Sequence, residues 1–136
     1  MQLRFVSILV SDQDAALRFY TDKLQFKKMA DIMMGDYRFL TVSAPDGIEG
    51  VQLILEPNDF PPAQVYQKAR HSAGIPAISI TSTDIHADYE RLTNLGVAFK
   101  AAPVDQGPVT GATFDDTCGN LVYLVQPKKT QGRTRR

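Results

Sequence analysis

Residues 5–26 (FVSILVSDQDAALRFYTDKLQF) combine a short apolar stretch, a helix-capping signal and an amphipathic helix. A degenerate copy of this order occupies residues 75–99 (IPAISITSTDIHADYERLTNLGVAF). Each copy continues into further strand-like sequence that ends near a proline, Pro57 in the first case and Pro127 in the second. An element order that occurs twice is what an internal duplication predicts. The sequence therefore predicts two similar modules in one small chain.

The first module begins with a predicted strand, because residues 3–10 are rich in Val, Ile, Leu and Phe and alternate imperfectly. Phe5 and Ser7 share one strand face, and the other face is wholly apolar and is expected to meet the helix. Ser11 or Asp12 can cap that helix. The helix carries one apolar stripe, formed by Ala15, Ala16, Phe19, Tyr20 and Leu24.

Gln25 lies where the first helix ends, a position at which glycine often supplies a positive φ. If Gln25 adopts that conformation, the strain amounts to roughly 1–2 kcal/mol. The rest of the module is predicted as strands and turns. The strands are expected at 27–31, 37–43 and 51–55, and the turns at 33–36 and 45–47.

A connector follows, and we expect it to bridge the two modules. It contains Pro61-Pro62, a short predicted helix over residues 63–72, and Gly74 as the helix stop. The second module then repeats the order. Its helix is capped by Ser82, Thr83 or Asp84, carries a stripe of Ile85, Tyr89, Leu92 and Leu95, and ends at Gly96. Strands are predicted at 75–81, 97–101, 112–115 and 121–125, with a glycine-rich loop over 104–113 and a turn at 117–120.

Composition indicates an ordinary globular protein. The chain has 136 residues, which predicts one domain, with 43% hydrophobic and 22% charged residues. The formal net charge is zero, so we expect neither nucleic acid nor a membrane as a partner. The one concentration of charge is residues 128–136, a basic tail expected to be flexible, for which binding to an anionic surface is the alternative.

Cys118 is the single cysteine, so no intrachain disulfide can form, which fits a reducing compartment. The N-terminal residues lack the pattern of a secretory signal, and no apolar run approaches the roughly 18 residues that span a bilayer. We therefore expect a cytoplasmic protein.

Two phrases carry a family resemblance: Val10-Ser11-Asp12 with residues 15–26, and residues 114–123 (FDDTCGNLVY) with an Asp-x-x-Gly-Asn turn before the last strand. They resemble the vicinal oxygen chelate superfamily, which includes glyoxalase I, bleomycin-resistance proteins and extradiol dioxygenases. Gln25 departs from the family's Leu-Gly-Phe phrase. The resemblance implies an α+β fold in which two βαβββ modules form curved mixed sheets around a cavity, usually in dimers. The single domain would span residues 1–127, with module one at 1–57, the connector at 58–73 and module two at 74–127.

Metal-using relatives place one His, Glu or Gln ligand on each of four strands. Carried over by the resemblance, these positions fall on Phe5, Gln52, Ile75 or Ala77, and Tyr123. Only Gln52 could coordinate, whereas Zn, Ni or Fe sites need about three protein ligands. We therefore predict no metal and no other cofactor.

The other residues that could carry out chemistry are explained by structural roles. We interpret His71 and His86 as surface residues, and Asp115 and Asp116 as turn and cap residues rather than an acid–base pair. Cys118 has no nearby histidine to activate it. Residues 107–111 lack the Gly-Lys-Ser/Thr ending of a phosphate loop and fit a mobile flap better.

The predicted function is metal-independent binding of a compact, partly apolar small molecule, as in bleomycin-resistance proteins, and we expect the protein to be a homodimer. The predicted ligand-binding residues are Phe5, Ser7, Tyr37, Phe39, Gln52, Ile54 and Tyr123. One alternative is a metal-dependent glyoxalase-like lyase or dioxygenase, with candidate ligands Gln52, Glu56, His71 and His86. A structural dimer with a filled barrel is the other alternative.

Overall fold

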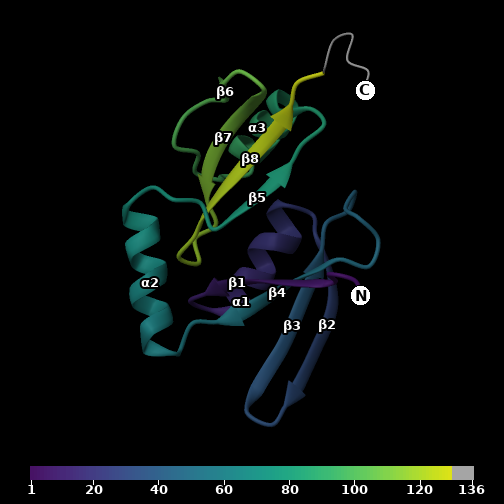
Figure 1. Cartoon of the computed structure of the whole chain (residues 1–136), viewed down its shortest axis with the longest axis vertical. Coiled ribbons are helices and arrows are strands. Elements are labelled where there is room, and N and C mark those ends of the chain that lie inside the picture. The colour runs from purple at the N-terminus through teal and green to yellow at the C-terminus, as the bar shows by residue number, and fades with distance from the viewer. Residues whose placement is uncertain (130–136) are drawn as a thin grey trace.

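The computed structural model describes residues 1–129 and contains two four-stranded sheets joined by a long helix (Figure 1). The first module consists of β1 (Phe5–Val10), α1 (Gln13–Arg18), the π-helical turn η1 (Phe19–Lys23), β2 (Lys27–Met34), β3 (Tyr37–Ser43) and β4 (Gln52–Pro57). The connector forms α2 (Pro61–Ser72). The second module consists of β5 (Ile78–Thr81), α3 (Ile85–Asn94), β6 (Val104–Asp105), β7 (Val109–Asp115) and β8 (Leu121–Pro127).

The two sheets have the same topology. The strand order is β1-β4-β3-β2 in the first and β5-β8-β7-β6 in the second. In each sheet the opening strand pairs in parallel with the closing strand, and the remaining neighbours are antiparallel. This duplicated βαβββ arrangement confirms the predicted α+β fold.

The two module helices begin in the same way. Asp12 precedes α1 at φ −151°, and its side chain accepts a hydrogen bond from the Ala15 amide at 3.0 Å. Asp84 precedes α3 at the same φ and accepts from the Ala87 amide at 3.1 Å. Each carboxylate satisfies an amide that the first helical turn leaves free, so the predicted caps are confirmed.

The helices end differently. After α1 the backbone continues through the π-helical turn and reaches Gln25 at φ 62°, so Gln25 adopts the left-handed conformation that the sequence left open. After α3 the same role falls to Gly96 at φ 91°, where the absence of a Cβ removes the strain.

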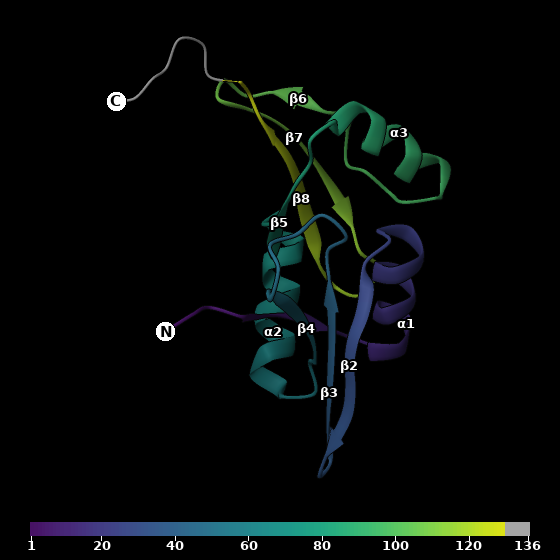
Figure 2. The same ribbon diagram turned by 90° about the vertical axis from the view of Figure 1, so that its right-hand side faces the viewer.

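The core lies between the modules and on the helix side of both sheets. Figure 2 shows α1 and α3 on one side of the molecule and α2 on the other. Phe19 of the first module packs against Phe114 of the second, with ring centroids 6.2 Å apart. The Tyr20 hydroxyl donates to the buried Asp116 carboxylate at 2.7 Å, although 96 residues separate the two. The modules therefore share one core.

Several predicted boundaries are wrong in the second half of the chain. The predicted strand over 97–101 reduces to an isolated bridge between Phe99 and Phe114. The predicted glycine-rich loop over 104–113 is largely a hairpin of β6 and β7, since Gln106 and Val109 close a backbone hydrogen bond of 2.8 Å. Local glycine content suggested a loop, but cross-strand pairing overrides it.

Smaller differences occur elsewhere. β2 extends to Met34, so the predicted turn over 33–36 narrows to the segment around Gly35. The predicted connector helix is confirmed, although it starts at Pro61 rather than at residue 63. Residues 130–136 of the predicted basic tail lie outside the described residues. Within residues 1–129, the helices are too short or too polar to cross a membrane.

Candidate functional site

Six of the seven predicted ligand-binding residues lie on one face of the first sheet. The parallel register pairs Phe5 with Gln52 and Ser7 with Ile54, which places both pairs on the same side. On β3, Thr41 is opposite Ile54, so Phe39 and Tyr37 follow on that side at two-residue spacing. We call the side chains of Phe5, Ser7, Tyr37, Phe39, Gln52 and Ile54 the open face.

The open face is apolar and accessible. Phe5 is 45% exposed and Tyr37 is 36% exposed, whereas Leu40 and Leu53 on the opposite face are buried. The Phe5 and Phe39 rings meet edge to face at 5.7 Å. An accessible aromatic pair on a sheet is suited to contact with an apolar ligand or with another protein surface.

Two polar side chains on this face have defined hydrogen-bonding roles. The buried Thr41 hydroxyl donates to Gln52 Oε1 at 2.6 Å and accepts from the Ala30 amide at 3.1 Å. The Gln52 amide oxygen is therefore already engaged, while its NH₂ group can donate.

The hydroxyl of Tyr37 can also donate. Burial, and then the neighbouring Glu56 charge, raise the pKa of Tyr37, so its hydroxyl stays protonated at neutral pH.

Tyr123, the seventh predicted residue, belongs to the second sheet. Its ring lies across Gly111, where an added Cβ would come within 2.0 Å of the hydroxyl oxygen. The hydroxyl hydrogen-bonds the Gln106 side chain. Tyr123 therefore covers its own sheet, and a single chain does not bring it together with the open face.

The residues do not fit a metal site of the kind the resemblance implies. The carried-over positions hold Phe5, Gln52, Ile75 or Ala77, and Tyr123. Among residues 1–129 there is no group of three or more His, Cys, Asp or Glu side chains placed to hold a metal ion.

The candidate metal ligands of the lyase alternative lie on different elements. Gln52 and Glu56 are on β4, and His86 is on α3. His71, on α2, is paired through Nε2 with the Asp115 carboxylate at 2.8 Å. Within residues 1–129, Glu56, His71 and His86 do not form a group that could hold a metal ion.

Cys118 and Asp116 belong to a structural turn between β7 and β8. Asp116 accepts from the Cys118 amide at 2.8 Å, from the Asn120 amide at 3.1 Å and from the Asn120 side chain at 2.9 Å. Burial, and then the Asp116 charge, raise the pKa of Cys118 to about 11. The sulfur therefore remains a thiol at neutral pH, which disfavours a nucleophilic role.

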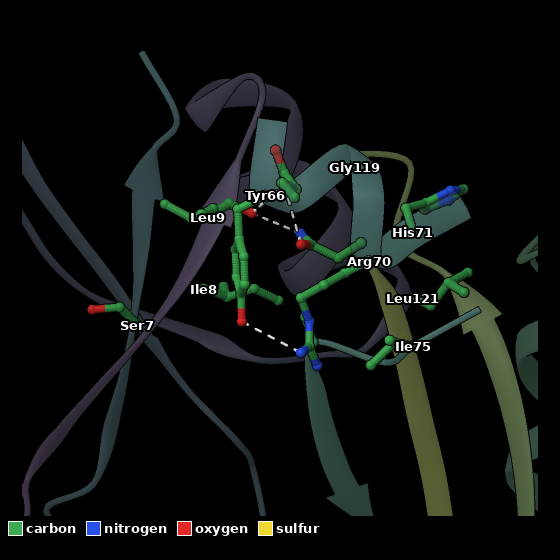
Figure 3. A pocket seen from close by; sticks show the side chains of 12 residues that line it. Ser7, Ile8, Leu9, Tyr66, Arg70, His71, Ile75, Gly119 and Leu121 are labelled. Carbon is green, nitrogen blue, oxygen red and sulfur yellow. Dashed lines mark hydrogen bonds between the residues drawn. The ribbon is translucent and has the colours of Figure 1, made fainter. Parts of the chain in front are cut away.

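Two hollows lie between the modules. The larger, about 770 Å³, is on the helix side and is lined mainly by apolar side chains such as Val42, Leu53, Ile80 and Phe114. The smaller, about 240 Å³, lies beneath α2, and Ser7 is the predicted residue that lines it (Figure 3).

Sequence reasoning missed Tyr66 and Arg70, which also line the smaller pocket. The available signal was their spacing of four residues on a predicted helix, which places them on one face.

Comparison with known proteins agrees with this geometry. A family model described as the Glyoxalase/Bleomycin resistance protein/Dioxygenase superfamily matches residues 2–124. The uncharacterized protein YurT of Bacillus subtilis (strain 168) is 48% identical over 93% of this chain and 99% of its own length.

Two solved structures are similar over most of the chain. UcmS2 is 32% identical with a TM-score of 0.80, covering 92% of this chain and 97% of its own. TnmS3, an antibiotic binding protein from Streptomyces sp. CB03234, is 25% identical with a TM-score of 0.72, covering 94% and 97%. The chain belongs to the glyoxalase/bleomycin resistance protein/dioxygenase superfamily.

Proposed function

We propose that this protein binds a compact, partly apolar small molecule on the open face, without a metal ion. The observation that carries the proposal is the aromatic surface of exposed Phe5 and Tyr37 and half-buried Phe39 beside hydrogen-bonding groups of Ser7 and Gln52. Apolar walls with a few placed polar groups are the usual composition of a ligand site. The antibiotic-binding activity of TnmS3, a structural relative, supports the same class of function.

We further propose that the active form is a homodimer. One chain leaves the exposed aromatic side chains of the open face uncovered. A second copy can cover the face and bring its own Tyr123 toward the ligand. Light scattering on the purified protein is expected to give twice the chain mass, and a monomer that binds ligand equally well would contradict this arrangement.

The ligand proposal is tested by native mass spectrometry and metal analysis of protein purified without added metal. A co-purifying small molecule is expected with the wild type and is lost in Phe39→Ala. Phe60→Ala is the matched control, since Phe60 is 68% exposed at the start of α2, outside the open face. Stoichiometric Ni, Zn, Mn or Fe, or equal loss in both variants, would refute the proposal.

Activity assays on the same purified protein test the enzymatic alternative. Glyoxalase and extradiol-cleavage assays with added divalent metals are expected to show no activity. Activity that disappears in Gln52→Ala would favour a metal-dependent lyase or dioxygenase instead.

A further inference from the structure

The smaller pocket lies where α2 crosses between the modules, and side chains of both modules form its walls (Figure 3). Ser7 and Leu9 come from β1, while Ala77 and Leu121 come from the second module. Tyr66 and Arg70 project from one face of α2 toward this space. The chain thus brings together distant segments around a volume of about 240 Å³, which suits a small molecule.

The floor of the pocket is held by a buried hydrogen-bond network. Gln67 Nε2 donates to the Leu9 carbonyl at 2.8 Å and to Asn120 Oδ1 at 3.1 Å, while its Oε1 accepts from Asn58 at 2.7 Å. Gly119 makes room for this side chain, because a Cβ there would lie 2.7 Å from Gln67 Nε2. The network fixes α2 to both modules, so the pocket walls are preorganised.

Arg70 supplies a cationic group at the pocket. Its Nη2 donates to the Pro76 carbonyl at 2.7 Å and its Nη1 to the Tyr66 hydroxyl at 3.3 Å. Its Cζ also lies 5.5 Å from the centre of the Tyr66 ring. These contacts orient the guanidinium but involve only neutral groups.

No carboxylate neutralises that charge within the described part of the chain, where the ion pairs involve other cations. Asp115 is engaged by His71 and by the Thr117 amide. A half-buried guanidinium without a counter-ion favours an anion, and its planar donors match a carboxylate. Leu9, Ile75 and Leu121 add apolar surface beside it.

We propose that this pocket is a second binding site, which takes a small organic monocarboxylate with an apolar body. Arg70 binds the carboxylate, and the apolar walls hold the remainder. The pocket adjoins the open face, since Ser7 borders both, but Tyr66 and Arg70 belong to the pocket alone.

The test is a calorimetric titration of the full chain with benzoate, and with benzamide as the neutral isostere. Benzoate is expected to bind about tenfold more tightly than benzamide, since a charge-assisted hydrogen bond is lost in the amide. Arg70→Gln is expected to lose a similar factor for benzoate only. Arg18→Gln, an exposed arginine on α1, is the matched control and leaves binding unchanged.

Equal binding of benzoate and benzamide, or unchanged benzoate affinity in Arg70→Gln, would overturn the proposal. Tighter binding of inorganic phosphate than of benzoate would overturn the assignment to a carboxylate. Arg70→Lys, which keeps the charge but not the planar fork, is the second variant if Arg70→Gln fails to fold, and is expected to bind benzoate with intermediate affinity. Phe39→Ala is expected to retain benzoate binding, which distinguishes failure here from failure of the open-face proposal.

Discussion

The two modules share their strand order, their parallel pairing and their helix caps, yet the outer faces of their sheets differ. The first module leaves Phe5 and Tyr37 exposed and Phe39 half-buried. In the second module Tyr123 lies over Gly111 and hydrogen-bonds Gln106, while the small side chains of Ser79 and Thr81 on the same face are exposed. A duplicated topology therefore does not produce duplicated surfaces, because the side chains at a few positions of the two faces differ in size and polarity.

The junction between the modules is expected to give the largest effect. Asp116 accepts hydrogen bonds from Tyr20 and from the 118–120 segment, so Asp116→Ala leaves several buried donors without a partner. We expect the free energy of unfolding in urea to fall by about 3–5 kcal/mol. Tyr20→Phe removes one of these bonds and is expected to cost less. Equal stability of wild type and Asp116→Ala would contradict the role of this junction.

The same carboxyl predicts a pH dependence. Burial raises the pKa of Asp116 above its ordinary 3.8, against the opposing effect of its hydrogen bonds. Between the pKa of Asp116 in the unfolded chain and its higher pKa in the folded chain, the folded chain binds more protons than the unfolded chain. The Asp116 contribution to stability therefore falls as pH rises through this interval. The stability difference between wild type and Asp116→Asn is expected to shrink with rising pH above 3.8. A stability difference that grows with rising pH would show that folding lowers the pKa of Asp116.

Substitutions at two neighbouring residues of β3 compare the buried face of the first sheet with its open face. Leu40 is buried, and Leu40→Ala is expected to lower the free energy of unfolding by about 2–5 kcal/mol. Phe39 lies on the open face, and Phe39→Ala is expected to cost about 1 kcal/mol, mainly through its contact with Phe5. Guanidinium unfolding of both variants measures the contrast. A larger loss for Phe39→Ala would mean that the open face is part of the core.

A substitution at Gly111 tests the contact that seats the Tyr123 ring on the second sheet. Gly111→Ala brings a methyl group into the Tyr123 ring and is expected to cost about 1–3 kcal/mol, measured by urea unfolding. The double variant with Tyr123→Ser is expected to cost less than the sum of the single changes, because the overlap is then absent. Additive losses would show that Tyr123 does not determine the strain at this position.

The smallest expected effect concerns the helix ends. Gln25 has φ 62° where the second module uses glycine, so Gln25→Gly is expected to raise the free energy of unfolding by about 1 kcal/mol or less. Gly96→Ala makes the opposite change at φ 91° and is expected to destabilise by about 1 kcal/mol. Thermal unfolding of both variants measures the pair. Destabilisation by Gln25→Gly would show that the glutamine side chain contributes more than its backbone strain costs.

Local patterns predicted most of the fold and part of the candidate site. Two-residue alternation identified which face Phe5, Ser7 and Gln52 occupy, and the parallel register of β1 and β4 agrees with it. The same patterns failed for 97–101 and for the β6–β7 hairpin, where pairing with distant strands decides the structure. Sequence spacing also gave no sign that Tyr123 would turn across Gly111.

The sequence by itself determined the two modules, the capping segments of their helices and the alternation of each strand face, because these follow from interactions between residues close in the chain. Only the tertiary structure decided that Tyr20 meets Asp116, that Tyr123 covers its own sheet, and that Arg70 faces β1 and β8. Those outcomes depend on how two modules and a connecting helix pack together, and such contacts between distant residues leave no periodic signal in the sequence.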